Sequence, residues 1–424
     1  MTILSDGKVQ PEVAARGVLM GPTPASQRDL QAHLVAHGAV PAMDAREVLQ
    51  LAIDSSLAGH GGAGFPLYRK LEAVIAAPGR AIVVANGAEG EPASAKDRWL
   101  LARRPHLVLD GLQLVARATK ATDAYLYVNH RVPVERLTRA LDERRRAGLD
   151  LVTVTVVTAP HAFISGEETA VVSRLSGATA LPRFKSPRVT ERGVRGRPTL
   201  VSNVETLALL ALLARRGATW FRAAGTSDAP GTMLLSVGGA VRAPGIVEVG
   251  YGSPLPDVLA LVGGPSTQMQ GVLLGGYHGT WLTTEEFASA KLSRSDLAPL
   301  GASPGAGVMV ALARGTCGLV EMSRVMSYLA EESAGQCGPC LNGLPRIANE
   351  LKSVAFRGGD RRSLVEMRRP GGMVVGRGAC HHPDGSMRFL RTGLHVFNTE
   401  VELHLAGHCS RTSSDVVLPT VGTR

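Results

Sequence analysis

The sequence has few cysteines, few aromatic residues and no long apolar run. Five cysteines among 424 residues are too few for a disulfide framework. No apolar run approaches the roughly 20 residues that cross a bilayer, and the best one, residues 207–214, is flanked by Glu205 and Arg215. The first residues also lack the basic and apolar pattern of a secretory signal. We therefore expect a cytoplasmic protein, either free or peripheral to a membrane complex, with no segment inserted in the bilayer.

Acidic residues are outnumbered by basic ones, which gives a formal net charge of +10. An arginine-rich composition alone explains this excess, and a basic docking surface for an acidic protein or an anionic cofactor is the alternative. Nucleic-acid binding is disfavoured, because the basic clusters at 144–146 and 361–369 contain no aromatic residues and aromatics form only 4% of the chain. The sequence thus predicts no nucleic-acid partner.

With 45% hydrophobic residues the chain can form packed cores, and its length predicts about two to four domains. Between residues 80 and 175, apolar runs alternate with segments of helical spacing. The expected order is strand 81–86, helix 97–119, strand 124–128, helix 134–146, strand 151–157 and a helix that begins near Glu167. This order predicts an α/β fold with a parallel sheet and helices on its faces.

After residue 230 the pattern changes to short strands separated by glycine and proline, and after residue 321 it becomes helical. Residues 1–45 show no sustained period and are predicted to form an arm or cover. These changes set the expected boundaries: an N-terminal arm and glycine-rich loop at 1–66, the parallel-sheet domain at 67–228, a β-rich domain at 229–317 and a helical domain at 318–424.

A glycine-rich loop occupies residues 59–66. Gly59, Gly61 and Gly64 match the G-x-G-x-x-G pattern formally, but the segment before them is helical rather than a strand, so the dinucleotide fingerprint is weak. Glycines without side chains nevertheless expose backbone N–H groups, which a phosphate or a flat ring can approach closely. A plain turn is the alternative interpretation.

Two acidic loops follow the first and third expected strands. Glu89 and Glu91 lie in the first loop, and Glu167 and Glu168 in the second. Because the carboxyl ends of parallel strands meet at one edge of the sheet, we expect these side chains to share a crevice. There they would accept hydrogen bonds from sugar or ribityl hydroxyls, or move protons. Capping of a helix N-terminus is the alternative for Glu167 and Glu168. A third polar segment, residues 202–206, resembles a helix start.

Three cysteines have a spacing that suits a metal. Cys337 and Cys340 are three residues apart, and Cys380 follows forty residues later. Soft thiolates of this kind suit an iron–sulfur cluster or zinc. His381 and His382 also offer imidazole, so that a Cys₃His zinc site is the rival interpretation. The remaining two cysteines, Cys317 and Cys409, are interpreted as packing residues or as residues without a role in the site.

The segments GHGGAGFP, NGAEGEPASAKDR, ISGEETA, PTLVSNVETL and ESAGQCGPC occur in this order along the chain. Together they resemble the flavin-bearing, NADH-oxidising F-type subunit of bacterial respiratory complex I and its relatives in soluble hydrogenases and formate dehydrogenases. The resemblance extends from about residue 45 to about residue 410. It implies a Rossmann-like FMN domain, a ubiquitin-like β-grasp domain of the soluble-ligand-binding kind, and a helical bundle that holds one [4Fe–4S] cluster.

The resemblance also implies site residues, with no side chain in the role of a catalytic acid or base. The FMN positions would be Gly59, Gly61, Gly62, Lys70, Asn86, Glu89, Gly166, Glu167, Asn203 and Thr206. The positions at NADH or NADPH would be Phe65, Glu91, Glu168 and Lys185. The iron–sulfur ligands would be Cys337, Cys340 and Cys380.

The chain departs from this family at several motif positions. Ala334 stands where the family has a fourth cysteine, which predicts a three-iron cluster, a fourth ligand from His381, His382, water or a partner, or no cluster. Arg188 replaces an aromatic residue, and Ala88 replaces an aspartate of the flavin loop. The first functional hypothesis is an FMN oxidoreductase that passes electrons from NADH or NADPH to a thioredoxin-like or ferredoxin-like iron–sulfur partner. The second is an electron-transfer or scaffold subunit that has lost nicotinamide turnover.

Overall fold

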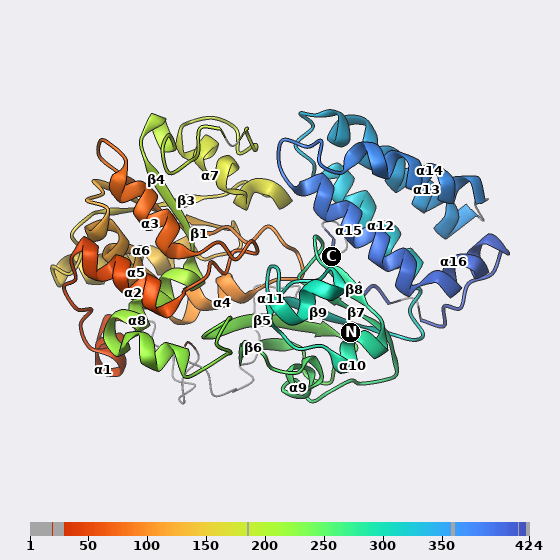
Figure 1. Ribbon diagram of the computed structural model, residues 1–424, viewed down its shortest axis with the longest axis horizontal. Coiled ribbons are helices and arrows are strands. Elements are labelled where there is room, and N and C mark those ends of the chain that lie inside the picture. Colours follow the sequence, from red (N-terminus) through yellow and green to blue (C-terminus); the bar gives the residue numbers. More distant parts are fainter. Residues whose placement is uncertain (1–18, 20–28, 185, 358–360, 414, 421–424) are drawn as a thin grey trace.

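The computed structural model describes residue 19 and residues 29–184, 186–357, 361–413 and 415–420. It contains three parts, which Figure 1 shows side by side: an α/β part, a β-rich part and a helical part. They follow one another along the chain in the predicted order, whereas their exact boundaries remain predictions. Most of the expected N-terminal arm lies outside the described residues.

The α/β part is built on a four-stranded parallel sheet with the order β3-β2-β1-β4. Its strands are β1 (Ile82–Gly87), β2 (Asp123–Val128), β3 (Val154–Thr158) and β4 (Thr199–Asn203). The three predicted strands are confirmed, and β4 is an additional strand. Because side chains alternate between the faces of a strand, Val83 and Ala85 of β1 pack into one core, and Ile82 and Val84 pack into another.

Helices cover both faces of this sheet. The larger core contains side chains of α2, α5 and α8, and the smaller one contains side chains of α7. The expected helix 97–119 forms as two helices, since Pro105 has no amide N–H to continue the first. The helices are α1 (Leu30–His37), α2 (Ala45–Ser55), α3 (Leu67–Ala76), α4 (Lys96–Arg103), α5 (Pro105–Ala118), α6 (Val134–Arg146), α7 (Glu168–Leu175) and α8 (Val204–Arg222).

The β-rich part is a mixed five-stranded sheet. Its strands are β5 (Thr232–Gly239), β6 (Gly245–Gly250), β7 (Met269–Leu274), β8 (Thr280–Leu282) and β9 (Val308–Ala313), in the order β6-β5-β9-β7-β8. β5 and β9, the first and last of these strands along the chain, pair in parallel at the centre of the sheet, and the other neighbouring strands are antiparallel. This is the β-grasp arrangement that the resemblance implied. The short helices α9 (Leu255–Ala260), α10 (Thr284–Ser289) and α11 (Arg294–Leu297) accompany it.

The helical part packs against the β-grasp sheet. It consists of α12 (Gly318–Glu331), α13 (Leu344–Arg357), α14 (Arg361–Val374), α15 (His382–Val396) and α16 (Asn398–Leu405), with a π-helical turn at Pro339–Gly343. The rings of Trp281 in β8 and Phe397 after α15 lie 4.8 Å apart between centroids, edge to face. One hydrophobic core therefore joins the two parts and fixes the helices relative to the sheet. In the described ranges, no helix combines the length and apolarity that a bilayer span needs.

Candidate functional site

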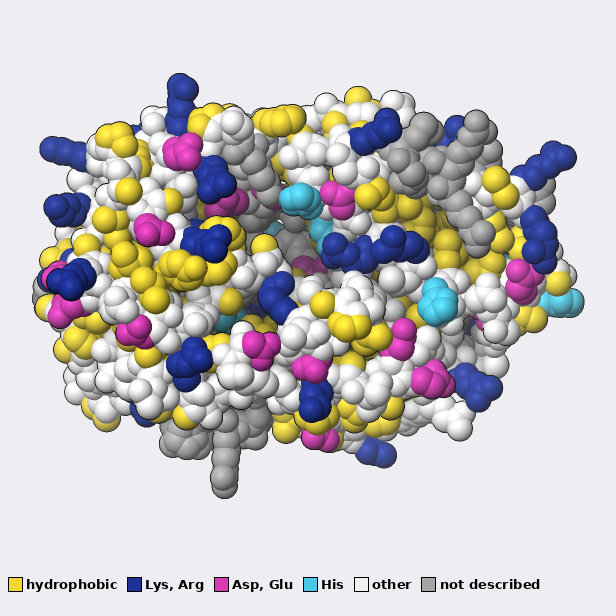
Figure 2. Space-filling view, viewed as in Figure 1, with side chains coloured by type: hydrophobic (Ala, Val, Ile, Leu, Met, Phe, Trp, Pro, Cys, Tyr) yellow, Lys and Arg dark blue, Asp and Glu magenta, His cyan; other side chains and the backbone are white. Residues whose placement is uncertain are grey.

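A cavity of about 1440 Å³ lies where the three parts meet. The glycine-rich loop, the carboxyl ends of β1 and β4 and the turn before α7 line it, together with segments of the β-grasp and helical parts. In Figure 2 the surface is hollowed near the centre of this face, where basic, acidic and histidine side chains gather. Pockets for small ligands usually measure about 300–1,000 Å³, so this cavity has room for a cofactor and a second large molecule.

Nearly all of the sequence-predicted site residues line this one cavity. The residues on its wall are Gly59, Gly61, Gly62, Phe65, Lys70, Asn86, Glu89, Glu91, Gly166, Glu167, Glu168, Asn203, Thr206 and Cys380. Lys185 lies outside the described residues. The predicted crevice with four carboxylates is confirmed, while the individual binding roles remain predictions.

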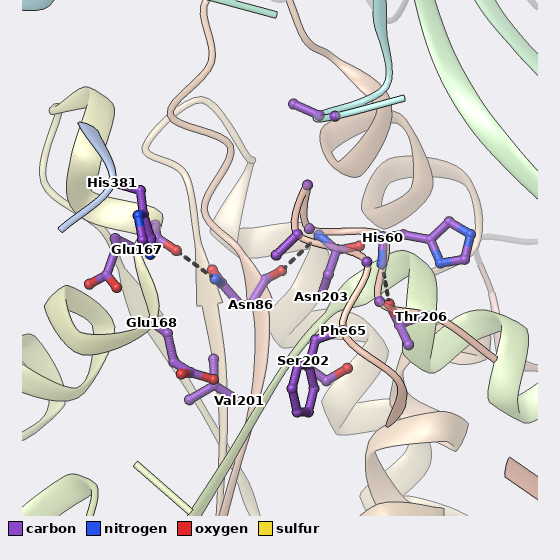
Figure 3. Close-up of a pocket in the computed structure, with 18 of the residues that line it drawn as sticks. His60, Phe65, Asn86, Glu167, Glu168, Val201, Ser202, Asn203, Thr206 and His381 are labelled. Atoms are coloured by element: carbon purple, nitrogen blue, oxygen red, sulfur yellow. Dashed lines mark hydrogen bonds between the residues drawn. The ribbon is translucent and has the colours of Figure 1, made fainter. Parts of the chain in front are cut away.

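The glycine-rich loop is an ordered turn that faces the cavity between α2 and α3. The His60 backbone N–H donates to Thr206 Oγ1 over 2.9 Å, which fixes the loop on the start of α8 (Figure 3). Gly62 has a φ of 104°, a value that favours glycine, and a Cβ at Gly61 would meet the Cβ of Asn203 at 3.5 Å. The loop is thus both a turn and an open cradle, which fits the approach of a flat ring or a phosphate.

Two asparagines hold the strand ends together beneath the cavity. Asn86 Nδ2 donates to the carbonyl of Gly166 over 2.9 Å, and Asn203 Nδ2 donates to the carbonyl of Asn86 over 3.3 Å (Figure 3). A Cβ at Gly166 would lie 2.3 Å from the carbonyl oxygen of Ala88, so only glycine allows these loops to approach. The asparagines therefore position the acidic loops, whatever else they bind.

The two carboxylates before α7 have different partners. Glu167 Oε2 accepts from the backbone N–H groups of Thr169 (2.8 Å) and Ala170 (3.1 Å), so that the capping interpretation holds for this residue. Glu168 Oε1 instead accepts from Lys70 Nζ over 2.7 Å, and the same ammonium donates to the carbonyl of Val201 over 2.9 Å. Both glutamates still lie on the cavity wall.

Glu91 connects the first acidic loop to the β-grasp part. Its Oε2 accepts from the Tyr277 backbone N–H over 2.7 Å, and its Oε1 accepts from the N–H of Ala93 over 3.2 Å. Burial of the carboxyl, to which the charge of Glu89 adds, raises the pKa of Glu91 to about 7. The resemblance implied a place for Glu91 at the nucleotide, whereas the structure also makes it a link between two parts of the molecule.

We expect Glu91 to make a contribution to stability that declines as the pH rises from about 4.5 to about 7, and Glu91→Gln to lack this contribution, so that the slope of stability against pH differs between the two proteins. A carboxyl whose pKa is raised on folding keeps its proton only in the folded state across this window, so each pH unit costs up to about 1.4 kcal/mol. Melting temperatures of both proteins between pH 4 and pH 8 measure the effect. An unchanged slope in the variant would show that Glu91 does not titrate there.

A buried charge network, which was not among the predicted sites, lies at one end of the cavity. Lys96 Nζ donates to Asp97 Oδ1 over 2.7 Å and to Glu205 Oε2 over 2.8 Å. Burial alone would lower the pKa of Lys96, but the two carboxylates hold it well above its usual value. Asn203 Nδ2 also donates to Asp97 Oδ2 over 2.7 Å. The sequence signal that could have identified this network is Lys96-Asp97, two charged residues at the start of α4 directly after the first acidic loop.

The three predicted metal-ligating cysteines belong to the helical part. Cys337 and Cys340 lie at the π-helical turn with 3.6 Å between their sulfur atoms, and Cys380 precedes α15 on the cavity wall. Burial, followed by the hydrogen bond and charge of Cys337 and the charge of Cys380, raises the pKa of Cys340 to about 11. Cys337 and Cys380 therefore lie close enough to Cys340 to act on its thiol, and neighbouring thiols of this kind suit a shared cationic centre. Ala334 offers no ligand atom, so three sulfurs fit such a centre and the fourth position is left to another group.

Comparisons with known proteins agree with this geometry. Residues 53–211 match the family described as the Nuo51 FMN-binding domain, and residues 321–404 match the NADH-ubiquinone oxidoreductase-F iron-sulfur binding region. The second F-type NADH-quinone oxidoreductase subunit of Rhizobium meliloti (strain 1021) is 30% identical over 374 residues, which are 85% of this chain and 89% of that protein. Fold and site together thus define an oxidoreductase subunit with an FMN-binding domain and an iron–sulfur binding region. The chain belongs to the family of the F-type subunits of NADH-quinone oxidoreductases.

Hydrogenase subunits are similar as well. The NAD-reducing hydrogenase HoxS subunit alpha of Cupriavidus necator is 32% identical over 377 residues, which are 85% of this chain and 61% of that protein. A crystal structure of an NAD⁺-reducing [NiFe]-hydrogenase in the air-oxidised state superposes with a TM-score of 0.81 at 30% identity, covering 88% of this chain and 65% of that chain. The chain thus spans just under two thirds of these longer hydrogenase subunits.

Proposed function

We propose that this chain is a diaphorase-type subunit that oxidises NADH or NADPH at FMN and passes the electrons singly to a protein acceptor through an iron–sulfur centre. The observation that carries the proposal is the shared cavity: its wall includes the glycine-rich loop, both acidic loops and Cys380. A flavin in this cavity would lie next to a cluster thiolate. Bound FMN would supply the chemistry that accepts a hydride and releases electrons one at a time.

The chain's own residues would bind and orient the two ring systems. Gly61 and Gly62 leave room on the cradle side, and Asn86 and Asn203 set the loops around it. Phe65, 43% exposed beside the cavity, offers a ring face toward a nucleotide. Hydride transfer needs no protein acid or base, so the contribution of these side chains would be positioning and exclusion of water.

Arg188 is the residue that could distinguish NADPH from NADH. It lines the same cavity as Phe65 and Glu168, and basic residues surround it in the sequence at Arg183 and Arg192. A guanidinium at this place can donate hydrogen bonds to the 2′-phosphate of NADPH or stack on a nucleotide ring. The other use of the basic run would be to dock an acidic redox protein.

Exposed apolar side chains of the helical part support a protein acceptor. Leu341, Phe356, Val365 and Val375 of the helical part are each more than half exposed. Leu341 directly follows Cys340 in the chain. Exposed apolar surface on one part of a protein can serve as an interaction site, and a thioredoxin-like or ferredoxin-like iron–sulfur subunit would be the partner.

The second candidate function is that of an electron-transfer or scaffold subunit without nicotinamide turnover. Ala334 favours it, since a missing thiolate changes the cluster, and so does Arg188 in place of an aromatic ring. In this case the FMN cradle would persist, and electrons would reach the cluster from another subunit.

An absorption spectrum of the full chain, purified without oxygen, tests the proposal. We expect bound FMN, iron with acid-labile sulfide, and bleaching of the flavin band when NADH and then NADPH is added. A preference for NADH of about tenfold or more would remove the 2′-phosphate role of Arg188. A flavin that neither nucleotide bleaches would support the scaffold function, and zinc without iron at these thiols would replace the cluster.

A further inference from the structure

A second group of metal-ligating side chains lies away from the cavity, at the other end of the helical part. It consists of Cys317 before α12, Glu400 and His404 one turn apart on α16, and Cys409 after that helix. One ligand atom from each of the four residues lies within 4.8 Å of the others. None of the four lines the cavity, and none belongs to the cysteine set at Cys337, Cys340 and Cys380.

The four side chains are aimed at one another. Cys317 Sγ lies 3.3 Å from His404 Nε2, which in turn lies 3.2 Å from Glu400 Oε1. Three of them are buried: Cys317 is 1% exposed, Glu400 is 6% exposed and His404 is 7% exposed. The Cys317 thiol is costly as an anion in this spot, because it is shielded from water and faces the Glu400 carboxylate. A cation in their centre would reverse this cost.

We propose that Cys317, Glu400, His404 and Cys409 bind one Zn²⁺ ion in a closed structural site. Zinc takes four ligands in a tetrahedron at about 2.0–2.3 Å, so two ligand atoms on one ion are about 3.3–3.8 Å apart. Cys317 Sγ and Glu400 Oε1 already lie at about this distance from His404 Nε2, and the widest pair of ligand atoms, within 4.8 Å, would close by about 1 Å on binding. Two thiolates, an imidazole and a carboxylate are ligands that zinc accepts. All four positions come from the protein, which leaves none open for a substrate.

The surroundings of the site support this arrangement. The Val320 N–H donates to Cys317 Sγ over 3.4 Å at the start of α12, where the helix dipole favours a thiolate. The Ser410 N–H donates to Glu400 Oε1 over 3.1 Å and orients the carboxylate. The zinc ion would therefore link two segments of the chain. One is the connection between β9 and α12, and the other is α16 with the residues that follow it. That segment already contacts the connection, since the Thr412 N–H donates to the carbonyl of Gly315 over 3.0 Å.

Metal analysis of the full chain, purified without oxygen, tests this site independently of the proposed activity. We expect one zinc per chain besides the iron. Cys409→Ser and His404→Ala should lower the zinc content about tenfold or more while iron and FMN stay at their wild-type level. His408→Ala is the matched control, because His408 is exposed next to Cys409 and outside the ligand group, and it should keep the zinc.

A second readout covers variants that fold poorly. Cobalt-substituted protein should show thiolate-to-cobalt charge-transfer absorption, and Cys409→Ser should weaken it. The proposal is overturned if wild-type protein takes up no zinc from a zinc-containing buffer, or if mass spectrometry finds a Cys317–Cys409 disulfide in its place. It is equally overturned if iron disappears together with zinc in Cys409→Ser, since these side chains would then serve the iron centre.

Discussion

Replacement of Cys340 by serine is expected to remove iron and acid-labile sulfide from the protein while FMN stays bound. The Cys340 thiol is buried and lies 3.6 Å from the Cys337 sulfur, so its loss removes a soft ligand that a serine hydroxyl does not replace. The rate of electron transfer to one-electron acceptors should then fall by about two orders of magnitude. Loss of a residue that only supports a metal ligand already lowers metal affinity or activity roughly 10–100-fold, and loss of the ligand itself should cost at least as much. Bleaching of the flavin by NADH should persist.

Iron and sulfide contents, the visible spectrum and the rate with a one-electron acceptor measure this effect. Cys409→Ser is the matched control, since it also removes a cysteine of the helical part but belongs to the other ligand group. It should keep its iron. Unchanged iron-dependent absorption in Cys340→Ser would mean that this thiol is not a ligand. Parallel loss of FMN would instead indicate that the π-helical turn supports the whole cavity.

Local patterns in the sequence were sufficient to place most of the cavity wall. The acidic loops were found because parallel strands end at the same edge of a sheet, and the glycine-rich loop was found because its composition is unusual. β4 was missed, since its five residues, Thr199–Asn203, merge with a segment that resembles a helix start. The break between α4 and α5 was missed although Pro105 marks it, because apolar spacing continues on both sides.

Contacts between distant segments had no comparable signal. Nothing near Glu91 indicated that the Tyr277 N–H, 186 residues away, would bind its carboxylate. Cys317 and His404 are 87 residues apart and came together only through the packing of α12, α15 and α16. Cys317 and Cys409 were interpreted as packing residues for this reason. A spacing rule finds ligands on one helix or loop, whereas a site built from three elements depends on the fold.

Replacement of Lys96 by methionine is expected to destabilise the protein strongly and to weaken flavin binding. Lys96 is 3% exposed and neutralises two buried carboxylates, Asp97 and Glu205. Removal of one partner of a buried ion pair costs about 3–5 kcal/mol, which lowers the melting temperature by roughly 3–6 °C in a chain of this size. Glu205 also accepts from the Leu234 N–H of β5 over 2.8 Å, so the damage would reach the contact between the α/β and β-grasp parts.

Lys70→Met separates this effect from the loss of a positive charge at the cavity. The Lys70–Glu168 pair is partly exposed, with side chains 23% and 35% accessible, so its loss should cost at most about 1 kcal/mol. Lys70 nevertheless lines the cavity, and its variant should bind FMN or nucleotide less tightly. Thermal unfolding at several pH values distinguishes the two lysines. In Lys96→Met the unpaired carboxylates regain protons in acid, so its deficit should shrink from pH 8 to pH 5. A deficit that stays constant over this range would mean that lost packing, rather than buried charge, destabilises the variant.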